Sequence, residues 1–402
     1  MSSSICKHYF GRLAAGVWRL WKEYQYDEAA FSDVALRMLT EEPPADQVSF
    51  LDVAKFGLFT NPLPFQPNIE SPFGQPPLTV HWQPEFRIEV LFWTSSVIGI
   101  HQHAFSGAFH LLTGSSLHTV WDFKCEERVS SQLLLGVLDL KKAELLGAGD
   151  TTAIIAGNRF IHATHHLDRP TVTVVIRTNS ERNHLPQYSY LEPFIAYNAV
   201  HGSAGVRRRL QLLQMLSATG RDKELLDAIK CLLDDVNHHY AFLYLLEAHK
   251  LIKDESKRNL LLSWAGSKHG RLAESFRLVL DTQEQRDKIW KIGEKIGPGE
   301  LQFFTALLRN IPRSGEILKI IRDRFPQEDP LTMIDKWTAD LSQYDLSDLG
   351  LSAPSLTQLI RELLDGYGPS TSPQAGVNRD EDNAPVSKSP AVEHAAVVSV
   401  VA

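Results

Sequence analysis

The spacing of hydrophobic positions changes twice along the chain. Residues 1 to about 57 have the helical spacing, with apolar side chains recurring every three to four positions. Two apolar stripes stand out, one formed by Leu13, Val17, Leu20 and Trp21 and the other by Phe31, Val34, Ala35 and Met38. The stretch NPLPFQPNIESPFGQPP that follows is rich in proline and glycine and predicts irregular backbone. We therefore expect residues 1–75 to form a helical segment and an irregular linker that pack on the next domain.

From Leu78 the pattern changes to short strands separated by turn residues. The strands read LTVHW, FRIEVLFW, AFHLLTG, SLHTVWDF, QLLLGVLDL, TTAIIAG, FIHAT and TVTVVIRT. About eight close-set strands in about 100 residues are typical of a sandwich or barrel of the jelly-roll kind. The sequence thus predicts a β-barrel over residues 76–195.

Helical spacing returns after about Val200 and continues to Tyr367. No fixed period relates these helices, which favours a bundle over a regular solenoid, and we expect an all-α domain over residues 201–367. Residues 368–402 are rich in Ser, Pro, Ala, Asp and Glu with almost no aromatic residue, a composition that predicts a disordered tail. The predicted fold class is α+β and multidomain, with N-terminal helices, a β jelly roll and a helical bundle.

Composition and charge exclude several classes of protein. The formal net charge of the 402 residues is -7, whereas a general nucleic-acid binder needs a basic face. No apolar run approaches the roughly 18–20 residues that cross a bilayer, and the N-terminus lacks the features of a signal peptide. The cysteines are odd in number and far apart, at Cys6, Cys125 and Cys231. They indicate reduced thiols in a cytoplasmic protein.

The strand region contains a candidate metal site. His101 and His103 are one residue apart at the start of a strand, so strand alternation directs both imidazoles to the same side. Two imidazoles held in this way can share one divalent cation at about 2.0–2.2 Å. His162 is the expected third ligand, with His165 or His166 as alternatives in its place. The competing interpretation is that these histidines are polar residues at loop edges.

These motifs resemble the two signatures of the cupin superfamily. They read HQHAFSGAFHLLTG, then GAGD, and later NRFIHATHHLDRPTVTVVIRT. Within that superfamily the chain is most similar to the cysteine dioxygenase (thiol dioxygenase) group, because FRIEVLFW precedes the H-x-H pair and WDF follows the second strand. The resemblance covers residues 75–180 and implies a cupin-type jelly roll. It also implies a mononuclear Fe(II) on His101, His103 and His162, with another divalent transition metal as the alternative.

The chain departs from that group at several positions. Many cupins carry a glutamate five residues after the H-x-H pair, where this chain has Ala108; thiol dioxygenases lack that carboxylate as well. The Ser-x-His-x-Tyr set of the thiol dioxygenases is matched here by Thr173, Val175 and Arg177, which keep only a hydroxyl. The arginine that binds the substrate carboxylate in that group aligns near His81, which cannot replace its fork of donors. Cysteine is therefore not supported as the substrate.

Three further residues are candidates for catalysis. Thr173 and Arg177 share one strand face, and a buried Arg177 would need an anionic partner, for which we expect a substrate carboxylate. The alternative is that Arg177 reaches solvent or pairs with Glu89 or Asp168. His110 shares the alternation of Ala108 and is a candidate proton donor, although a structural role in the core is the alternative. His118 is a weaker candidate of the same kind. Several aromatic residues are expected in the core and pocket walls: Trp82, Phe92, Trp93, Phe105 and Trp121.

Together these features predict an oxygenase that acts with O₂ on a small or carrier-bound anionic molecule. A cupin that binds metal or ligand without redox turnover, as a sensor or interaction protein, is the main alternative. A cupin isomerase or lyase is the third, because a fold does not determine a reaction. The helical domain has no metal or nucleophile cluster, so we interpret it as a lid, a self-association domain or a docking domain for a protein partner.

Overall fold

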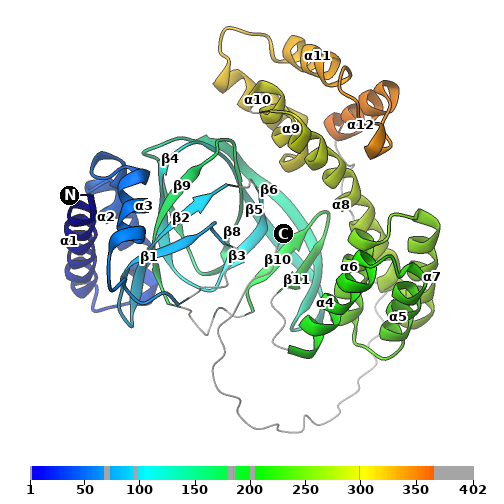
Figure 1. The fold of residues 1–402 in the computed structure, drawn as a ribbon, viewed down its shortest axis with the longest axis horizontal. Helices are drawn as coiled ribbons and strands as arrows, with labels where there is room; N and C mark the ends of the chain where they lie inside the picture. Colours follow the sequence, from blue (N-terminus) through cyan, green and yellow to red (C-terminus); the bar gives the residue numbers. More distant parts are fainter. Residues whose placement is uncertain are drawn as a thin grey trace.

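The computed structural model describes residues 2–67, 73–94, 97–179, 184, 186–199, 204–297 and 299–365. Three parts follow one another along the chain: N-terminal helices, a β-barrel and C-terminal helices (Figure 1). The barrel lies between the two helical parts, so both of its outer faces are covered.

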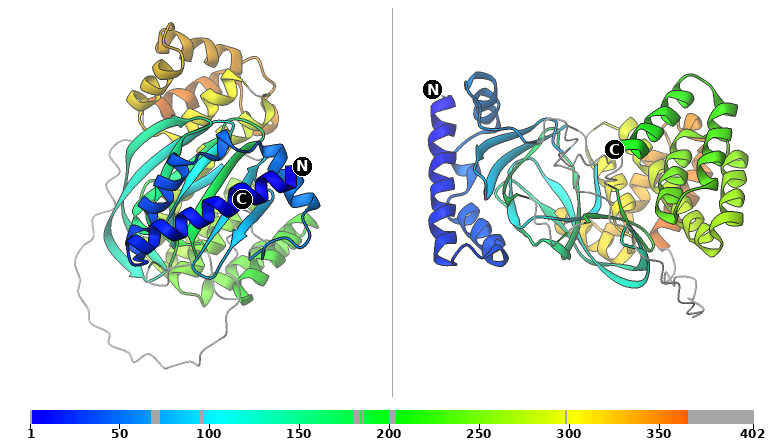
Figure 2. Two further views of the ribbon diagram at one scale, coloured as in Figure 1. Left: turned by 90° about the vertical axis from the view of Figure 1, so that its left-hand side faces the viewer. Right: turned by 90° about the horizontal axis from the view of Figure 1, so that it is seen from below.

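The N-terminal helices cover one sheet of the barrel. They are α1 (Ser2–Glu23), α2 (Phe31–Glu41) and α3 (Phe50–Phe59). Figure 2 shows α1 lying across this sheet. The apolar stripes of α1 and α2 join one hydrophobic cluster with the strand residues that face them, such as Ile88, Val174 and Ala108. Burial of these stripes is what holds the helices on the barrel.

That sheet has five strands in the order β1-β2-β9-β4-β7. Its strands are β1 (Pro77–Trp82), β2 (Phe86–Trp93), β9 (Thr171–Thr178), β4 (Gly107–Thr113) and β7 (Thr151–Ile154). Residues at even positions of β2 and β9 face the helices, so the odd positions face the opposite sheet.

The second sheet closes on itself in the order β10-β11-β6-β5-β8-β3. Its strands are β3 (Val97–His103), β5 (Ser116–Ser130), β6 (Leu133–Leu146), β8 (Gly157–His166), β10 (Tyr188–Leu191) and β11 (Ile195–Asn198). From β3 to β9 the chain alternates between the two sheets at most connections, which is the connectivity of a jelly roll. A small hydrophobic cluster containing Phe109 and Val175 from one sheet and Phe160 from the other fills the space between them, called the inter-sheet space below.

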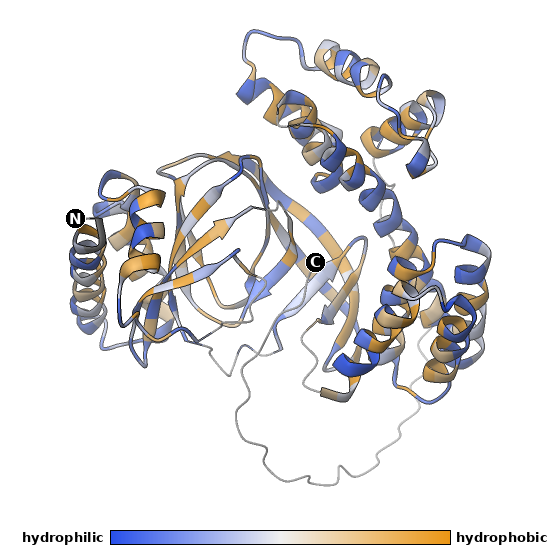
Figure 3. Ribbon diagram, viewed as in Figure 1, coloured by the Kyte–Doolittle hydropathy of each residue, from blue (hydrophilic) through white to orange (hydrophobic). Residues whose placement is uncertain are grey.

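The C-terminal helices form two groups joined by the 25-residue helix α8 (Figure 1). The first group is α4 (Ala204–Ala218), α5 (Asp222–Asp234), α6 (His238–Leu251) and α7 (Glu255–His269), and the second is α9 (Glu300–Asn310), α10 (Ser314–Arg324), α11 (Pro330–Leu341) and α12 (Ala353–Asp365), with α8 spanning Arg271–Lys295. In Figure 3 these helices carry hydrophobic and hydrophilic residues side by side, as amphipathic helices do. Each group shares a hydrophobic cluster with the outer face of the second sheet, through Leu133 and Tyr197 for the first group and Trp121 and Ile161 for the second.

The predicted architecture is confirmed: an α+β chain with N-terminal helices, a β jelly roll and an all-α C-terminal part. Among the helices of the described ranges, none combines the length and the apolar character that crossing a bilayer requires. The three cysteines are unpaired, with Cys6 buried and the other two exposed. The predicted tail, residues 368–402, lies outside the described residues.

Candidate metal centre

Three histidines from two neighbouring strands meet in the inter-sheet space. Strands β3 and β8 pair antiparallel, and this register sets His101 directly opposite His162. One ligand nitrogen from each of His101, His103 and His162 lies within 4.8 Å of the other two, and all three side chains are buried. Gln102, between the first two, accepts a hydrogen bond from the Tyr190 hydroxyl. Alternation along β3 thus delivers the pair of histidines to one side, as predicted, although the pair ends this strand and does not begin it.

The ring orientations bring one nitrogen of each imidazole to the centre of this group. His101 donates from Nδ1 to the carbonyl oxygen of Gly99 at 2.8 Å, which leaves its Nε2 as an acceptor. That Nε2 is buried and finds no hydrogen-bond partner among the described residues. His103 Nε2 and His162 Nε2 lie 2.8 Å apart. A buried polar atom without a partner is costly in a protein interior, so the orphaned nitrogen of His101 favours a ligand at this point.

Burial keeps these imidazoles neutral. It lowers the pKa of His101 to about 4. For His103 and His162, burial is again the largest cause, neighbouring histidines add to it, and the pKa of each falls well below its usual value. A metal ligand must carry a lone pair, so neutral imidazoles suit a divalent cation.

The donor set and spacing fit a divalent transition metal. Imidazole nitrogen binds Fe, Zn, Cu and Ni ions, with metal–nitrogen distances of about 2.0–2.1 Å. Two nitrogens on one such ion lie at most about 4.2 Å apart. The widest separation in the group exceeds this by little, so small side-chain rotations would close the group on an ion.

A chain of side-chain contacts leads from His162 through His118 to Glu144. His118 on β5 places Nε2 3.1 Å from His162 Nδ1, and its own Nδ1 lies 3.0 Å from Glu144 Oε1 on β6. Lys142 Nζ pairs with the other oxygen of Glu144 at 2.6 Å. The hydrogen bond from His118 is the main cause that lowers the pKa of Glu144 to about 2, against the effect of burial. The Glu144 side chain is 27% exposed, so this chain of contacts runs from the histidine group toward solvent.

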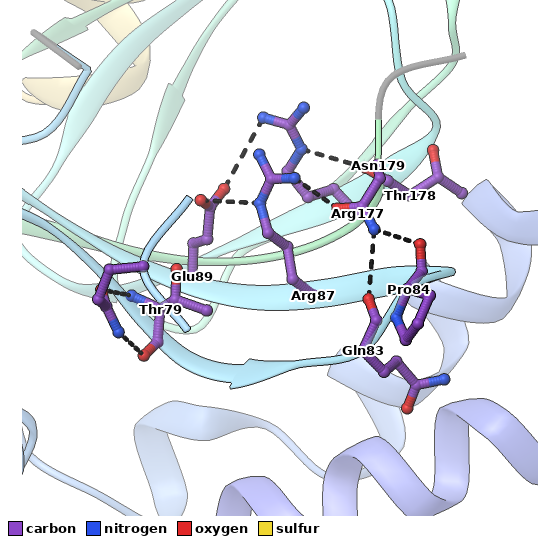
Figure 4. Close-up of polar contacts among 9 residues, drawn as sticks. Thr79, Gln83, Pro84, Arg87, Glu89, Arg177, Thr178 and Asn179 are labelled. Atoms are coloured by element: carbon purple, nitrogen blue, oxygen red, sulfur yellow. Dashed lines mark hydrogen bonds and ion pairs between the residues drawn. The ribbon is translucent and has the colours of Figure 1, made fainter. Parts of the chain in front are cut away.

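Two arginines and one glutamate form a second polar group in the inter-sheet space. Glu89 Oε1 lies 2.9 Å from Arg87 Nε, and its Oε2 lies 3.7 Å from Arg177 Nη1 (Figure 4). The Arg177 guanidinium lies over the ring of Phe105, 3.3 Å from its centroid, and that ring lies 4.5 Å from the His103 ring. Burial, followed by the charge of Arg87, lowers the pKa of Arg177 to about 9. Two cations therefore share one carboxylate beside the histidines.

Thr173 lies on the same face of β9 as Arg177. Its hydroxyl accepts a hydrogen bond of 3.0 Å from the Trp93 indole nitrogen. The Trp93 ring stacks on His166, whose Nδ1 lies 2.9 Å from the Ser116 hydroxyl. Thr173 is thus placed to fix an aromatic wall of the inter-sheet space.

His110 lies away from the histidine group. Ala108 belongs to the cluster under the N-terminal helices, and alternation places His110 on that same outer face. Its Nδ1 contacts the Thr151 hydroxyl at 2.8 Å. The expectation that His110 lines the pocket is therefore corrected. The inward-facing neighbour of Ala108 is Gly107, where an added Cβ would meet the Ile176 carbonyl oxygen at 2.1 Å. The expectation assumed that Ala108 faces the inter-sheet space, whereas the residue of this pair that faces it is Gly107.

His165 faces away from the inter-sheet space as well. Its ring packs against Trp290 of α8, and its Nδ1 lies 3.4 Å from the Asn310 amide nitrogen. His162 therefore supplies the third imidazole of the group. His81 stacks on Phe86 at the helix-covered face of the first sheet.

From the sequence, His118 was only a weak candidate, and neither Glu144 nor Arg87 was a candidate. His118 and Glu144 are directly paired between β5 and β6, and His118 lies opposite Thr164 on β8. Alternation within each strand indicates which side these residues face. Their contact with His162 depends on strand pairing, which a single sequence does not give.

No family model matches the chain, and no curated protein does. Among the similar solved structures, KdgF from Halomonas sp. is 14% identical over 27% of this chain and 83% of that chain, with a TM-score of 0.19. A cupin-2 domain containing protein from Shewanella frigidimarina NCIMB 400 is 12% identical over 32% and 91%, with a TM-score of 0.20. Hydroquinone 1,2-dioxygenase from Sphingomonas sp. TTNP3, solved with 4-hydroxybenzoate bound, is 10% identical over 27% and 67%, with a TM-score of 0.22. Structural similarity at such TM-scores does not establish a family, so membership of the cupin superfamily is a proposal.

Proposed function

We propose that this chain is a cupin oxygenase whose His101, His103 and His162 hold one Fe(II) ion. The convergence of three buried imidazoles, one with an orphaned Nε2, is the observation that carries the proposal. Fe(II) on three neutral protein ligands would supply open coordination positions for O₂ and for a substrate. The metal could instead be another divalent transition ion, because imidazole serves several of them.

An anionic substrate suits the charges beside the histidine group. Arg177 and Arg87 bring two positive charges into the inter-sheet space, and Glu89 brings one negative charge. The Arg177–Glu89 contact is the longer of the two, at 3.7 Å. A carboxylate of a small or carrier-bound substrate would supply the missing negative charge and pair with Arg177. Phe105 and Trp93 would form apolar walls, with Thr173 holding the Trp93 indole.

Metal binding is tested first. The protein is reconstituted anaerobically with Fe(II) or Zn(II), and bound metal is measured for wild type, His103→Ala and His8→Ala. His8 lies exposed on α1 and is the matched control. We expect about one ion per chain in wild type and His8→Ala, and a large loss in His103→Ala. Equal metal content in all three proteins would refute the site.

Turnover is tested second. The Fe(II)-loaded protein is screened for O₂ consumption with small carboxylates and thiols, beside an Arg177→Leu variant. We expect wild type to consume O₂ with an anionic substrate and Arg177→Leu to keep its metal while its KM for that substrate rises. Full activity in Arg177→Leu would remove Arg177 from the site.

The second candidate function is a cupin that binds metal or ligand without redox turnover, as a sensor or interaction protein. It is favoured by the large helical part, whose two groups share hydrophobic clusters with the barrel. A metal-dependent isomerase or lyase is a third. Bound metal without any O₂ consumption across the screen would favour these candidates over the oxygenase.

A further inference from the structure

The contact between His162 and its neighbour His118 determines which nitrogen of His162 faces the proposed metal. An imidazole ligand binds a metal through a nitrogen that carries no hydrogen. His162 Nε2 is the nitrogen next to His103 Nε2, whereas His162 Nδ1 faces His118. The hydrogen of a neutral His162 must therefore be on Nδ1 for the ring to bind a metal at the centre of the group.

We infer that His118 and Glu144 are positioning residues, which hold the His162 hydrogen on Nδ1 and leave the Nε2 lone pair facing His101 and His103. The effect on metal affinity rests on the proposed function, whereas the position of the hydrogen does not.

The direction of hydrogen bonding begins at the carboxylate. Glu144 contacts Lys142 at 2.6 Å and His118 at 3.0 Å, and its lowered pKa keeps it ionised near neutral pH. An ionised carboxylate only accepts hydrogen bonds, so His118 Nδ1 must donate to it. A neutral His118 then has a lone pair on Nε2.

The second contact follows from the first. The lone pair on His118 Nε2 accepts a hydrogen bond at 3.1 Å, and the only hydrogen available to that contact is on His162 Nδ1. His118 is 1% exposed and His162 is 4% exposed, so bulk water does not compete for this bond. His101 obtains the same orientation from the Gly99 carbonyl. Backbone and side-chain acceptors behind the ligands thus orient two of the three rings, as outer partners of metal-binding histidines do.

The tautomer is measured in the metal-free protein. Long-range ¹H–¹⁵N spectra of ¹⁵N-histidine-labelled protein distinguish the two tautomers, and the signal that disappears in His162→Asn is assigned to His162. We expect the Nδ1–H form in wild type and in His118→Gln, because glutamine both accepts and donates. In His118→Leu we expect a shift toward Nε2–H. An Nε2–H form in wild type, as a doubly protonated His118 would produce, overturns the inference, and so does an unchanged tautomer in His118→Leu. Should His118→Leu fail to fold, the tautomer of His162 in wild type and in His118→Gln still tests the inference.

The consequence is measured as Zn(II) affinity by competition with a chelator. We expect His118→Leu to lose about 10–100-fold in affinity. His118→Gln should stay within about threefold, and the exposed β5 control Asp122→Asn should match wild type. Equal affinities in His118→Leu and wild type contradict the positioning role. Absence of Zn(II) binding in wild type itself contradicts the proposed function but leaves the tautomer measurement decisive.

Discussion

The Glu89 carboxylate contacts both Arg87 and Arg177. Its side chain is 6% exposed, so neither solvent nor salt screens the group effectively. Removing one arginine would leave one cation and one anion, a balanced pair. Removing the glutamate would leave two buried cations near each other. The two changes are therefore expected to differ strongly in cost.

We predict that Glu89→Gln lowers the free energy of unfolding by about 3–5 kcal/mol, because it leaves buried charge uncompensated. Arg177→Leu should cost clearly less, since Arg87 keeps its 2.9 Å contact. Urea unfolding followed by circular dichroism measures both variants against wild type. Equal destabilisation by the two changes would show that the charge balance of this group is not what Glu89 provides.

Glu144 predicts a dependence of stability on pH. Its pKa is lowered to about 2, first by the hydrogen bond from His118, from an ordinary value of 4.5. Because the folded-state pKa is the lower one, the stabilisation is complete above about pH 4.5 and is lost as the pH falls toward 2. Glu144→Gln should thus be less stable than wild type at pH 7, with a gap that narrows between pH 4.5 and pH 2.5. Thermal unfolding at a series of pH values measures the gap. A gap that stays constant over this interval would contradict the assignment.

Part of the site is predictable from the sequence at the scale of single residues. His101 and His103 follow from strand alternation alone, and their convergence with His162 was predicted. The expected position of His110 was wrong because His110 faces the same side as Ala108, and Ala108 lies under the N-terminal helices. The contact of His118 with His162 depends on the register between β5 and β8, which involves residues more than forty positions apart in sequence. No local pattern contains that information.

Among the elements, the turn between β4 and β5 has a specific requirement. Gly114 has φ +83°, and a Cβ there would meet the Thr171 hydroxyl at 2.7 Å and Thr171 Cα at 2.9 Å. Gly149, in the turn between β6 and β7, has φ +98° with nothing within 4 Å of an added Cβ. The two glycines share backbone strain on substitution but differ in crowding.

We predict that Gly149→Ala costs about 1 kcal/mol and Gly114→Ala about 2–4 kcal/mol, because only the second variant also pushes against the β9 strand. The difference between their unfolding free energies isolates the contact with Thr171. If Gly149→Ala proved as costly as Gly114→Ala, crowding at Thr171 would be excluded as the cause.

Element types were largely predictable from the sequence, whereas pairing was not. The apolar stripes of α1 and α2 and the alternating runs of the barrel gave helices and strands directly. Strands β10 and β11, of four residues each, were not among the predicted runs, although the equally short β7 was. They belong to the second sheet because β11 pairs with β6 and β10 reaches β3 through Ser189 and His101.

For the whole molecule, the joining of the barrel and the C-terminal helices is the main structural result. Arg286 of α8 pairs with Glu192, between β10 and β11, at 2.6 Å, and both side chains are 8% exposed. Arg271 at the start of α8 makes two contacts with Glu127 of β5, at 2.9 and 2.6 Å. Together with the shared hydrophobic clusters, these pairs attach the long helix to the barrel along much of its length.

We predict that Arg286→Leu lowers the free energy of unfolding by about 3–5 kcal/mol, because Glu192 would remain buried without its partner. The matched control is Arg277→Leu on the same helix, whose side chain is 46% exposed and pairs with Glu274 one turn away. It should change stability by less than about 0.5 kcal/mol. Calorimetric unfolding of both variants measures the difference. A small effect in Arg286→Leu would mean that the buried pair does not join the two parts.

The two faces of strand β8 contact two different parts of the protein, the histidine group and the C-terminal helices. Its even positions bring His162 to the other two imidazoles, and its odd positions bring Ile161 and His165 to the C-terminal helices. Sliding this strand by a single residue would exchange the two sets, putting Ile161 among the imidazoles and turning His162 toward the C-terminal helices. Packing against the C-terminal helices therefore helps to fix the register of β8. As long as Ile161 is buried among these helices, His162, the proposed ligand on the other face, keeps its position.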